Sequence, residues 1–256
     1  MADQVPLYDE FSESYDVMVS WNERLAREGS FFRDLIRRVD ARRVLDVGCA
    51  TGGHVLRFSE MGLEAVGVDP SSKMIQIAQS RAAGRSGVSF LQAGFGELAE
   101  KVGGKFDLVV CLGNTLPHVL TKPALDDALQ DMGAVLRENG LLAIQQLNYD
   151  RILAEQQRFL GVSSGTREGV EHLFFRFYDF DGLKITFNVV TLKKENGQWG
   201  FRVDSTRLRA IRWAELKTAL ARAGFVSIEA YGSFDKEPFD PANSMDLVVV
   251  AERHTR

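Results

Sequence analysis

The sequence predicts an α/β fold in which a mostly parallel seven-stranded sheet is covered by helices on both faces. From residue 44 onward, short runs rich in β-branched residues alternate with segments whose apolar residues recur at helical spacing. Between residues 171 and 212 an alternating pattern replaces this rhythm, which predicts an antiparallel β insertion. Ahead of the sheet, aromatic residues at helical intervals predict an N-terminal helical lid.

The expected elements follow one another along the chain with short connections. Strands are expected at residues 43–47, 64–69, 88–92, 106–112, 141–147, 225–230 and 246–251. Helices are expected at residues 54–60, 72–83, 122–137 and 213–223. In the insertion, the alternating stretches 183–193 and 201–211 flank Glu195-Asn196-Gly197, which is typical of a hairpin turn.

These elements divide the chain into four regions. Residues 1–40 form the lid, 41–150 the main core, 151–212 the insertion, and 213–256 a helix and strands that complete the sheet. The aromatic residues of the lid are interpreted first as packing on the sheet; they are Tyr8, Phe11, Tyr15, Trp21, Phe31 and Phe32.

Composition narrows the class of protein. The 256 residues are 45% hydrophobic and carry a formal net charge of -4, which argues against a broad nucleic-acid surface. Cys49 and Cys111 lie in or at the end of apolar runs and are expected to be reduced. Neither a signal peptide nor a membrane span is recognised, so the cytoplasm is the expected location and no membrane contact is expected.

Residues 44–53, VLDVGCATGG, predict a buried strand that runs into a glycine turn and a helix, where a ligand approaches the backbone. A dinucleotide fingerprint has glycine at the third position of the turn, but this chain has Ala50. Asp69 ends the next strand, where a carboxylate accepts both hydroxyls of a ribose, although it is also suited to capping the following helix. An NAD-dependent oxidoreductase therefore stays open as an alternative.

These segments resemble class I S-adenosylmethionine-dependent methyltransferases, which have a Rossmann-like fold: DVGCATG is similar to their first motif and VGVDPS to their second. The resemblance implies that S-adenosylmethionine is the cofactor and S-adenosylhomocysteine the product. It also implies that Asp46 supports the ammonium group and Asp69 binds the ribose. The remaining residues that the resemblance assigns to the cofactor are Gly48, Cys49, Ala50, Gly52, Gly94, Phe95 and Leu112. Met74 resembles the apolar residue that packs against adenine in this family, although it also fits a core methionine at helical spacing.

A finer resemblance lies after the fourth and fifth strands. CLGNT at residues 111–115, His118, and Asn148-Tyr149-Asp150 are similar to the glycine and sarcosine N-methyltransferase branch, which implies a small-molecule acceptor. Many relatives carry an aspartate for the adenine amino group where this chain has Gly94. Adenine recognition is therefore expected from backbone groups near Gly94 and Phe95.

The acceptor atom is expected to be nitrogen or oxygen, with nitrogen slightly favoured. Asn114, Tyr15 and Tyr149 are candidates to orient an amine, and His118 is the candidate base for a hydroxyl, although His118 also fits a helix start after Pro117. No metal site is expected. A protein that binds the cofactor without turnover is an alternative, and a homodimer is possible.

One position departs from the branch in a way that affects the acceptor. The branch holds the substrate carboxylate with an arginine directly before Asn-Tyr-Asp, whereas this chain has Leu147. Glycine is therefore not expected to be a good acceptor. Arg176, Arg207 and Arg209 are alternative anchors, but each is interpreted first as a solvated strand residue.

Overall fold

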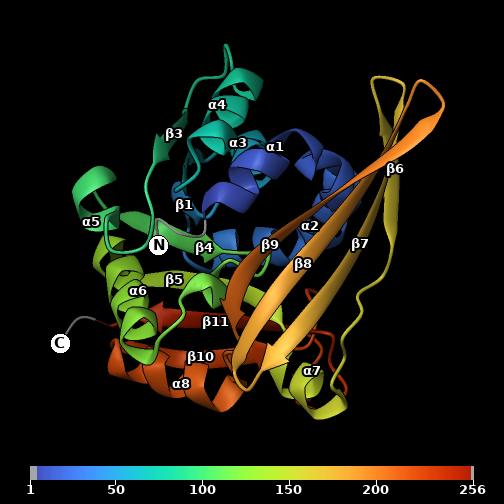
Figure 1. Cartoon of the computed structure of the whole chain (residues 1–256). Coiled ribbons are helices and arrows are strands. Elements are labelled where there is room, and N and C mark those ends of the chain that lie inside the picture. Colours follow the sequence, from blue (N-terminus) through green and yellow to red (C-terminus); the bar gives the residue numbers. More distant parts are fainter. Residues whose placement is uncertain (1–4, 255–256) are drawn as a thin grey trace.

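The computed structural model of the chain describes residues 5–254. Its main sheet has the strand order β10-β11-β5-β4-β1-β2-β3 (Figure 1). The pairs from β5 to β3 are parallel, and β11 runs antiparallel to both β5 and β10. The strands are β1 (Arg43–Val47), β2 (Glu64–Asp69), β3 (Val88–Gln92), β4 (Phe106–Cys111), β5 (Leu136–Leu147), β10 (Phe225–Tyr231) and β11 (Asp246–Arg253).

Helices cover both faces of this sheet because successive residues of each central strand point to opposite sides. One apolar cluster joins the sheet to α2 (Trp21–Arg38), α3 (Gly53–Glu60) and α4 (Ser72–Arg81). A second cluster joins the other face to α5 (Leu98–Lys101), α6 (Lys122–Val135) and α8 (Trp213–Arg222). Strand β1 contributes Val44 to the first cluster and Leu45 to the second.

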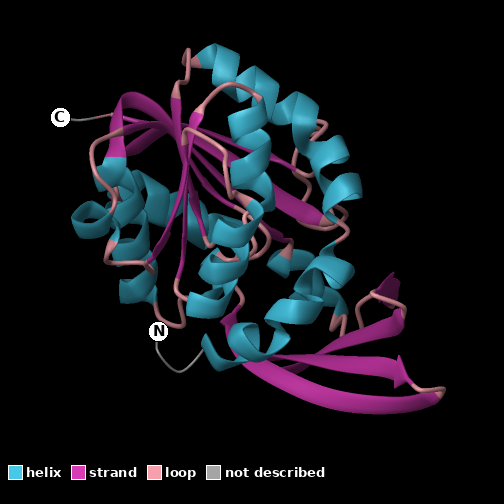
Figure 2. Ribbon diagram, turned by 90° about the horizontal axis from the view of Figure 1, so that it is seen from above, coloured by secondary structure: helices cyan, strands magenta, loops and turns pink. Residues whose placement is uncertain are grey.

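The insertion forms a separate sheet with the order β6-β7-β8-β9, and all its pairs are antiparallel. Its strands are β6 (Ser163–Arg167), β7 (Val170–Asp181), β8 (Lys184–Glu195) and β9 (Gln198–Arg209). The expected hairpin between β8 and β9 is present, and Asn196 and Gly197 both have positive φ, as a tight two-residue turn requires. Figure 2 shows this sheet as a layer of its own, with helices between it and the main sheet.

Helix α1 (Val5–Val19) packs against α4 and against β6, β7 and β9, so it bridges the two sheets (Figure 1). Polar contacts fasten it to the core: Asp9 accepts a hydrogen bond from Ser71 Oγ, and Asp16 pairs with Arg81 at 3.0 Å. Two short helical segments, η2 (Leu116–His118) and α7 (Tyr149–Glu155), follow β4 and β5.

The structure confirms the seven-stranded α/β architecture and the antiparallel insertion, and it differs from expectation at several elements. Only α1 has the position of a lid, because Phe31 and Phe32 of α2 are buried against the main sheet. Strand β5 begins at Leu136, where the sequence predicts the end of a helix. The short elements α5, α7 and β6 were not expected, since each is too brief to carry a clear period.

Both cysteines are buried free thiols, as expected. Within residues 5–254, no helix combines the length and the apolar character needed to cross a membrane.

Candidate active site

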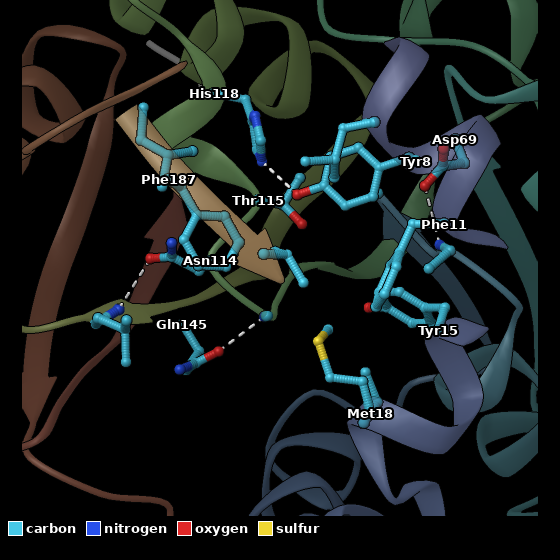
Figure 3. Close-up of a pocket in the computed structure, with 18 of the residues that line it drawn as sticks. Tyr8, Phe11, Tyr15, Met18, Asp69, Asn114, Thr115, His118, Gln145 and Phe187 are labelled. Atoms are coloured by element: carbon cyan, nitrogen blue, oxygen red, sulfur yellow. Dashed lines mark hydrogen bonds between the residues drawn. The ribbon is translucent and has the colours of Figure 1, made fainter. Parts of the chain in front are cut away.

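A cavity of about 620 Å³ lies where the carboxyl ends of β1, β2, β4 and β5 face the insertion sheet. This is the edge of a parallel sheet at which ligands bind in doubly wound folds. Helix α1 borders the cavity with Tyr8, Phe11, Tyr15 and Met18, as Figure 3 shows. The volume lies within the range of about 300–1,000 Å³ usual for small-molecule sites.

The glycine turn after β1 forms one side of the cavity through Gly48 and Ala50. Both residues have left-handed φ values, +79° and +47°. A Cβ on Gly48 would lie 2.4 Å from Cγ2 of Thr115, in the loop after β4. Glycine is therefore required here for two reasons: the two loops approach each other closely, and the backbone is left-handed.

Asp69 lies at the end of β2 with its carboxylate in the cavity wall (Figure 3). Its Oδ2 accepts a hydrogen bond from the Ala50 amide at 2.9 Å, and its Oδ1 accepts one from the Ser71 amide at 2.9 Å. Burial raises the pKa of this carboxyl to about 6. Each carboxylate oxygen retains a lone pair for a further donor, so the group fits a ribose diol.

The helix after β2 is capped by Ser71, whose Oγ accepts a hydrogen bond from Met74 N. Ser71 therefore fills the N-cap position for which Asp69 was the alternative. Met74 itself is fully buried and lies outside the cavity wall, so the expectation that it packs against adenine is corrected to a packing role.

Four other residues assigned to the cofactor lie outside the wall: Asp46, which is described below, and Cys49, Gly52 and Leu112. The Cys49 amide donates to the Val68 carbonyl, and the Cys49 thiol lies near Gly67 of β2. A Cβ on Gly52 would meet the Phe90 ring at 2.6 Å, so this glycine serves packing. Leu112 is buried among the core residues of the α2 face.

Gly94 and Phe95 line the cavity at the end of β3, as expected. Both backbone groups of Gly94 are already engaged by Glu97, since the Gly94 amide donates to the Glu97 carboxylate and the Gly94 carbonyl accepts from the Glu97 amide. The Gly94 carbonyl keeps a second lone pair, so adenine recognition by backbone groups near Gly94 and Phe95 stays a prediction. The Phe95 side chain is a further group of the wall that can contact a base.

Asp46 is buried below the glycine turn and does not reach the cavity wall. Its Oδ2 has no hydrogen-bond partner among the described residues, and burial raises the pKa of its carboxyl to about 7. The charge of Arg24 acts in the opposite direction on this pKa. An unsatisfied buried carboxylate beside the turn is compatible with a cationic group nearby, so its proposed link to the ammonium is retained as a prediction.

Arg24 of α2 lines the cavity and was not identified from the sequence. Its Nε donates to Glu28 Oε1 at 3.0 Å, and its guanidinium lies over the Trp21 ring. The Nη atoms come within 3.1–3.2 Å of where a Cβ on Gly113 would stand, which brings the charge to the loop after β4. A guanidinium in this position is suited to bind a carboxylate.

The loop after β4 also holds Asn114, whose backbone is left-handed with φ +66°. Its Oδ1 accepts a hydrogen bond from the Leu147 amide at 3.1 Å, which fixes the orientation of the amide group (Figure 3). Its Nδ2 donates to Tyr149 Oη at 2.9 Å. Tyr149 is fully buried behind the wall, so it orients Asn114 and does not itself reach the cavity.

His118 lines the cavity from η2, and Tyr8 Oη lies 2.8 Å from its Nε2 (Figure 3). Burial lowers the pKa of this imidazole to about 4, so it is neutral at physiological pH and a weak base. Burial also raises the pKa of the Tyr8 and Tyr15 phenols, to about 12 for Tyr15. Tyr15 lines the cavity from α1, where it was expected to face the acceptor.

The insertion sheet closes the cavity on the side opposite the glycine turn. Its wall is mainly apolar and consists of Tyr178, Phe187, Val189 and Leu208, with Leu160 ahead of β6. The sequence did not identify these residues, because alternation alone does not tell which face of a strand meets a cavity.

The three arginines considered as alternative anchors have different environments. Arg207 is exposed, as expected for a solvated strand residue. Arg209 is buried and pairs with Glu215, and Arg176 lines the cavity, so the interpretation of both as solvated residues was wrong. The Nε of Arg176 is buried without a partner among the described residues, and burial lowers the pKa of its guanidinium.

Comparison with known proteins identifies the family of this chain. Residues 44–140 match the model of a methyltransferase domain. The chain is 30% identical to a glycine/sarcosine N-methyltransferase of Parasynechococcus marenigrum (strain WH8102), over 97% of this chain and 84% of that protein. It is 28% identical to a glycine/sarcosine N-methyltransferase of Halorhodospira halochloris, over 97% and 89%.

Solved structures support the fold. An S-adenosylmethionine-dependent methyltransferase of Clostridium acetobutylicum superposes with a TM-score of 0.78 at 12% identity, over 97% of this chain and 99% of that one. An amino pentose methyltransferase of Micromonospora echinaspora, solved with S-adenosylmethionine, gives a TM-score of 0.71 at 22% identity, over 95% and 96%. The oxidoreductase and the non-catalytic interpretations are set aside. This chain is an S-adenosylmethionine-dependent methyltransferase of small molecules, and it belongs to the glycine/sarcosine N-methyltransferase family.

Proposed function

We propose that this enzyme methylates the nitrogen of a small amine that carries a carboxylate and is larger than glycine, such as an amino acid with an apolar side chain. The observation that carries this proposal is Arg176, a partly desolvated guanidinium in an otherwise apolar part of the cavity wall. Arg176 Nη2 donates to the Gly161 carbonyl at 3.2 Å, but no carboxylate among the described residues pairs with its charge, and a carboxylate on the acceptor offsets the cost of burying that charge. Two relatives are named for glycine and sarcosine, which are also amines with a carboxylate.

A chain of polar groups connects the two ends of the proposed acceptor site. Asn114 donates to Tyr149 Oη, Tyr149 packs in one buried cluster with Tyr178, and Tyr178 lies two residues after Arg176 on the same face of β7. Because two tyrosines separate Arg176 from Asn114, an acceptor that reaches both needs a longer span than glycine has. The apolar wall formed by Phe187 and Val189 suits an apolar side chain.

Nitrogen is favoured over oxygen because the wall offers poor bases. His118 is a weak base that already shares a hydrogen bond with Tyr8, and the phenols have raised pKa values. Burial raises the pKa of the Asp246 carboxyl against the charges of Arg27 and Arg24, and its Oδ1 is already engaged by a hydrogen bond from Gln145. An amine brings its own lone pair, whereas a hydroxyl needs a base to remove its proton.

S-adenosylmethionine supplies a methyl group on a positively charged sulfur. We assign the ribose to Asp69, the carboxylate of the methionine part to Arg24, and the adenine face to Phe95. Asn114 orients the amine, and Arg176 fixes the far end of the acceptor. Such positioning is worth roughly 7–11 kcal/mol in well-oriented intramolecular reactions, so no acid-base dyad is needed.

The test compares amino acids with the matching amines that lack the carboxylate, using labelled methyl donor and mass spectrometry of the product. The variant Arg176→Met keeps length and apolar contact but removes the charge. We expect the wild type to prefer the carboxylated acceptors by roughly 100-fold in kcat/KM, and the variant to lose this preference while cofactor affinity stays the same.

Arg207→Met is the matched control, because Arg207 is an exposed arginine of the same sheet. It should retain the wild-type preference. Equal or better turnover of amines without a carboxylate by the wild type would contradict the role of Arg176. An O-methylated product would contradict the choice of nitrogen.

A further inference from the structure

The insertion sheet has two faces, and each carries apolar side chains. Residues that are paired across two strands lie on the same face, so the register between β7 and β8 shows which residues belong to each face. The inner face, which includes Phe174, Tyr178 and Val189, is buried against α1 and the cavity. The outer face points the other way, and its half nearer the β8-β9 hairpin is apolar, whereas Asn188, Ser205 and Arg207 make the other half polar. The apolar residues are Leu173, Phe175, Phe177, Val190, Leu192, Trp199, Phe201 and Val203, with Phe159 stacked on Phe175.

Much of this outer face is open to solvent. The exposed fractions are 77% for Phe201, 56% for Phe159, 51% for Val203 and 46% for Trp199. These four side chains alone present on the order of 400 Å² of apolar surface, if an aromatic side chain carries about 150–250 Å². A patch of this size on a monomer usually marks a binding surface.

We propose that the outer face binds the same face of a second copy of this chain, so that the enzyme is a dimer built sheet against sheet. The area supports this occupant. A standard interface takes about 800 Å² from each partner. The four exposed side chains supply about half of that, and the five half-buried apolar residues of the face add to it.

Charges at the two ends of the face also suit a second copy. Glu171 pairs with Lys194 at 3.3 Å at one end, and Asp179 pairs with Arg158 at 2.7 Å at the other. A two-fold axis that lies between the two sheets and runs perpendicular to the strands would bring one end of each copy against the opposite end of its partner. Each end then meets a pair with both signs of charge, with no accumulation of like charge.

The aromatic character of the face agrees with an interface between proteins. Three cation-π contacts already border it: Arg158 lies over Phe159 and Phe177, and Lys194 lies over Trp199. Aromatic residues and arginine are enriched in interface cores, where they contribute most of the binding energy. The same strands carry the acceptor side of the cavity on their inner face, so association would brace that wall.

The experiment measures the mass of the full chain by light scattering and by sedimentation between about 1 and 100 μM, where standard interfaces associate. Phe201→Glu places a charge on the most exposed of these apolar side chains, on the edge strand β9. Because Phe201 is largely exposed in the single chain, this change should leave the fold and the cofactor affinity unaltered. Val226→Glu is the matched control, since Val226 is exposed at 42% on β10 of the other sheet.

We expect the wild type and the control to be dimers. The dissociation constant of the Phe201→Glu dimer should be at least 100-fold higher. Extrapolated to low concentration, where each protein is a monomer, the melting temperatures of the variant and the wild type should be the same. A wild type that is monomeric up to 100 μM would overturn the proposal. This holds also if the monomer is then found to bind neutral or anionic vesicles or another protein through the outer face. An oligomer that persists in Phe201→Glu would also overturn it, because its interface would lie elsewhere.

Discussion

Replacing Asp69 by asparagine tests the assignment of this carboxylate to the ribose. Charge-assisted hydrogen bonds are worth about 1.5–3 kcal/mol, so the loss should raise the dissociation constant of S-adenosylmethionine roughly 10- to 150-fold. Asparagine is the better choice than alanine, because Asp69 also accepts from the Ala50 and Ser71 amides. Alanine would leave both amides unsatisfied and would lower the stability of the fold as well.

Titration calorimetry measures this affinity directly, and a matched variant separates binding from stability. Asp107→Asn removes a carboxylate that also accepts from two backbone amides, those of Arg42 and Arg43, but at the opposite end of β1. We expect it to lower stability and leave cofactor affinity unchanged. Loss of a charge-assisted hydrogen bond should weaken binding about tenfold. If a folded Asp69→Asn variant binds the cofactor within about twofold of the wild type, the ribose assignment is refuted.

The pH dependence gives a second measure of the same group. The pKa of Asp69 is raised to about 6 in the free protein, and ribose hydroxyls bind the charged form. The contribution of Asp69 to cofactor affinity should therefore be constant above about pH 6 and fall by up to tenfold for each pH unit below it, since one unit of pKa is worth about 1.4 kcal/mol. In Asp69→Asn this slope should disappear, and an unchanged slope would assign it to another group.

Three further outcomes are expected. Gly48→Ala should lower both the melting temperature and cofactor affinity, because its Cβ would lie 2.4 Å from Thr115 Cγ2 at a φ of +79°; normal values in calorimetry would contradict this. Tyr8→Phe should lower kcat/KM by only about fivefold, the worth of one hydrogen bond, whereas a larger loss with a shifted pH-rate profile would make His118 a general base. Glycine turnover should be roughly 100-fold below that of larger amino acids and should rise in Leu147→Arg; efficient glycine turnover by the wild type would contradict the acceptor size.

The part of the site that the sequence predicts well is local in the chain. The strand, the glycine turn and Asp69 follow each other within one β-α-β unit, so their positions are determined by short-range rules. The structure accordingly has Gly48, Ala50 and Asp69 on one wall of the cavity. Met74 was misassigned because an apolar residue at helical spacing has the same pattern whether it contacts a ligand or the core.

The residues that the sequence missed depend on long-range pairing. Arg24 is one of several arginines on α2, and only the approach of this helix to Gly113 distinguishes it. On β7, Phe174 and Tyr178 flank Arg176 on one face, and Phe175 and Phe177 lie on the other. Because both faces are apolar, alternation does not reveal which one is the inner face. The pairing of β7 with β8 and the position of α1 decide which face meets the cavity.

The contact between Gly48 and Thr115 has a consequence for the order of events in a catalytic cycle. The turn after β1 borders the part of the cavity that we assign to the methyl donor, and Thr115 directly follows Asn114, which we assign to the methyl acceptor. When the first ligand immobilises one turn, the other has less freedom left to lose, so the second ligand binds more tightly. Thermodynamic reciprocity then requires each ligand to strengthen the other by the same factor. On this argument we expect the ternary complex to be favoured over either half-filled state.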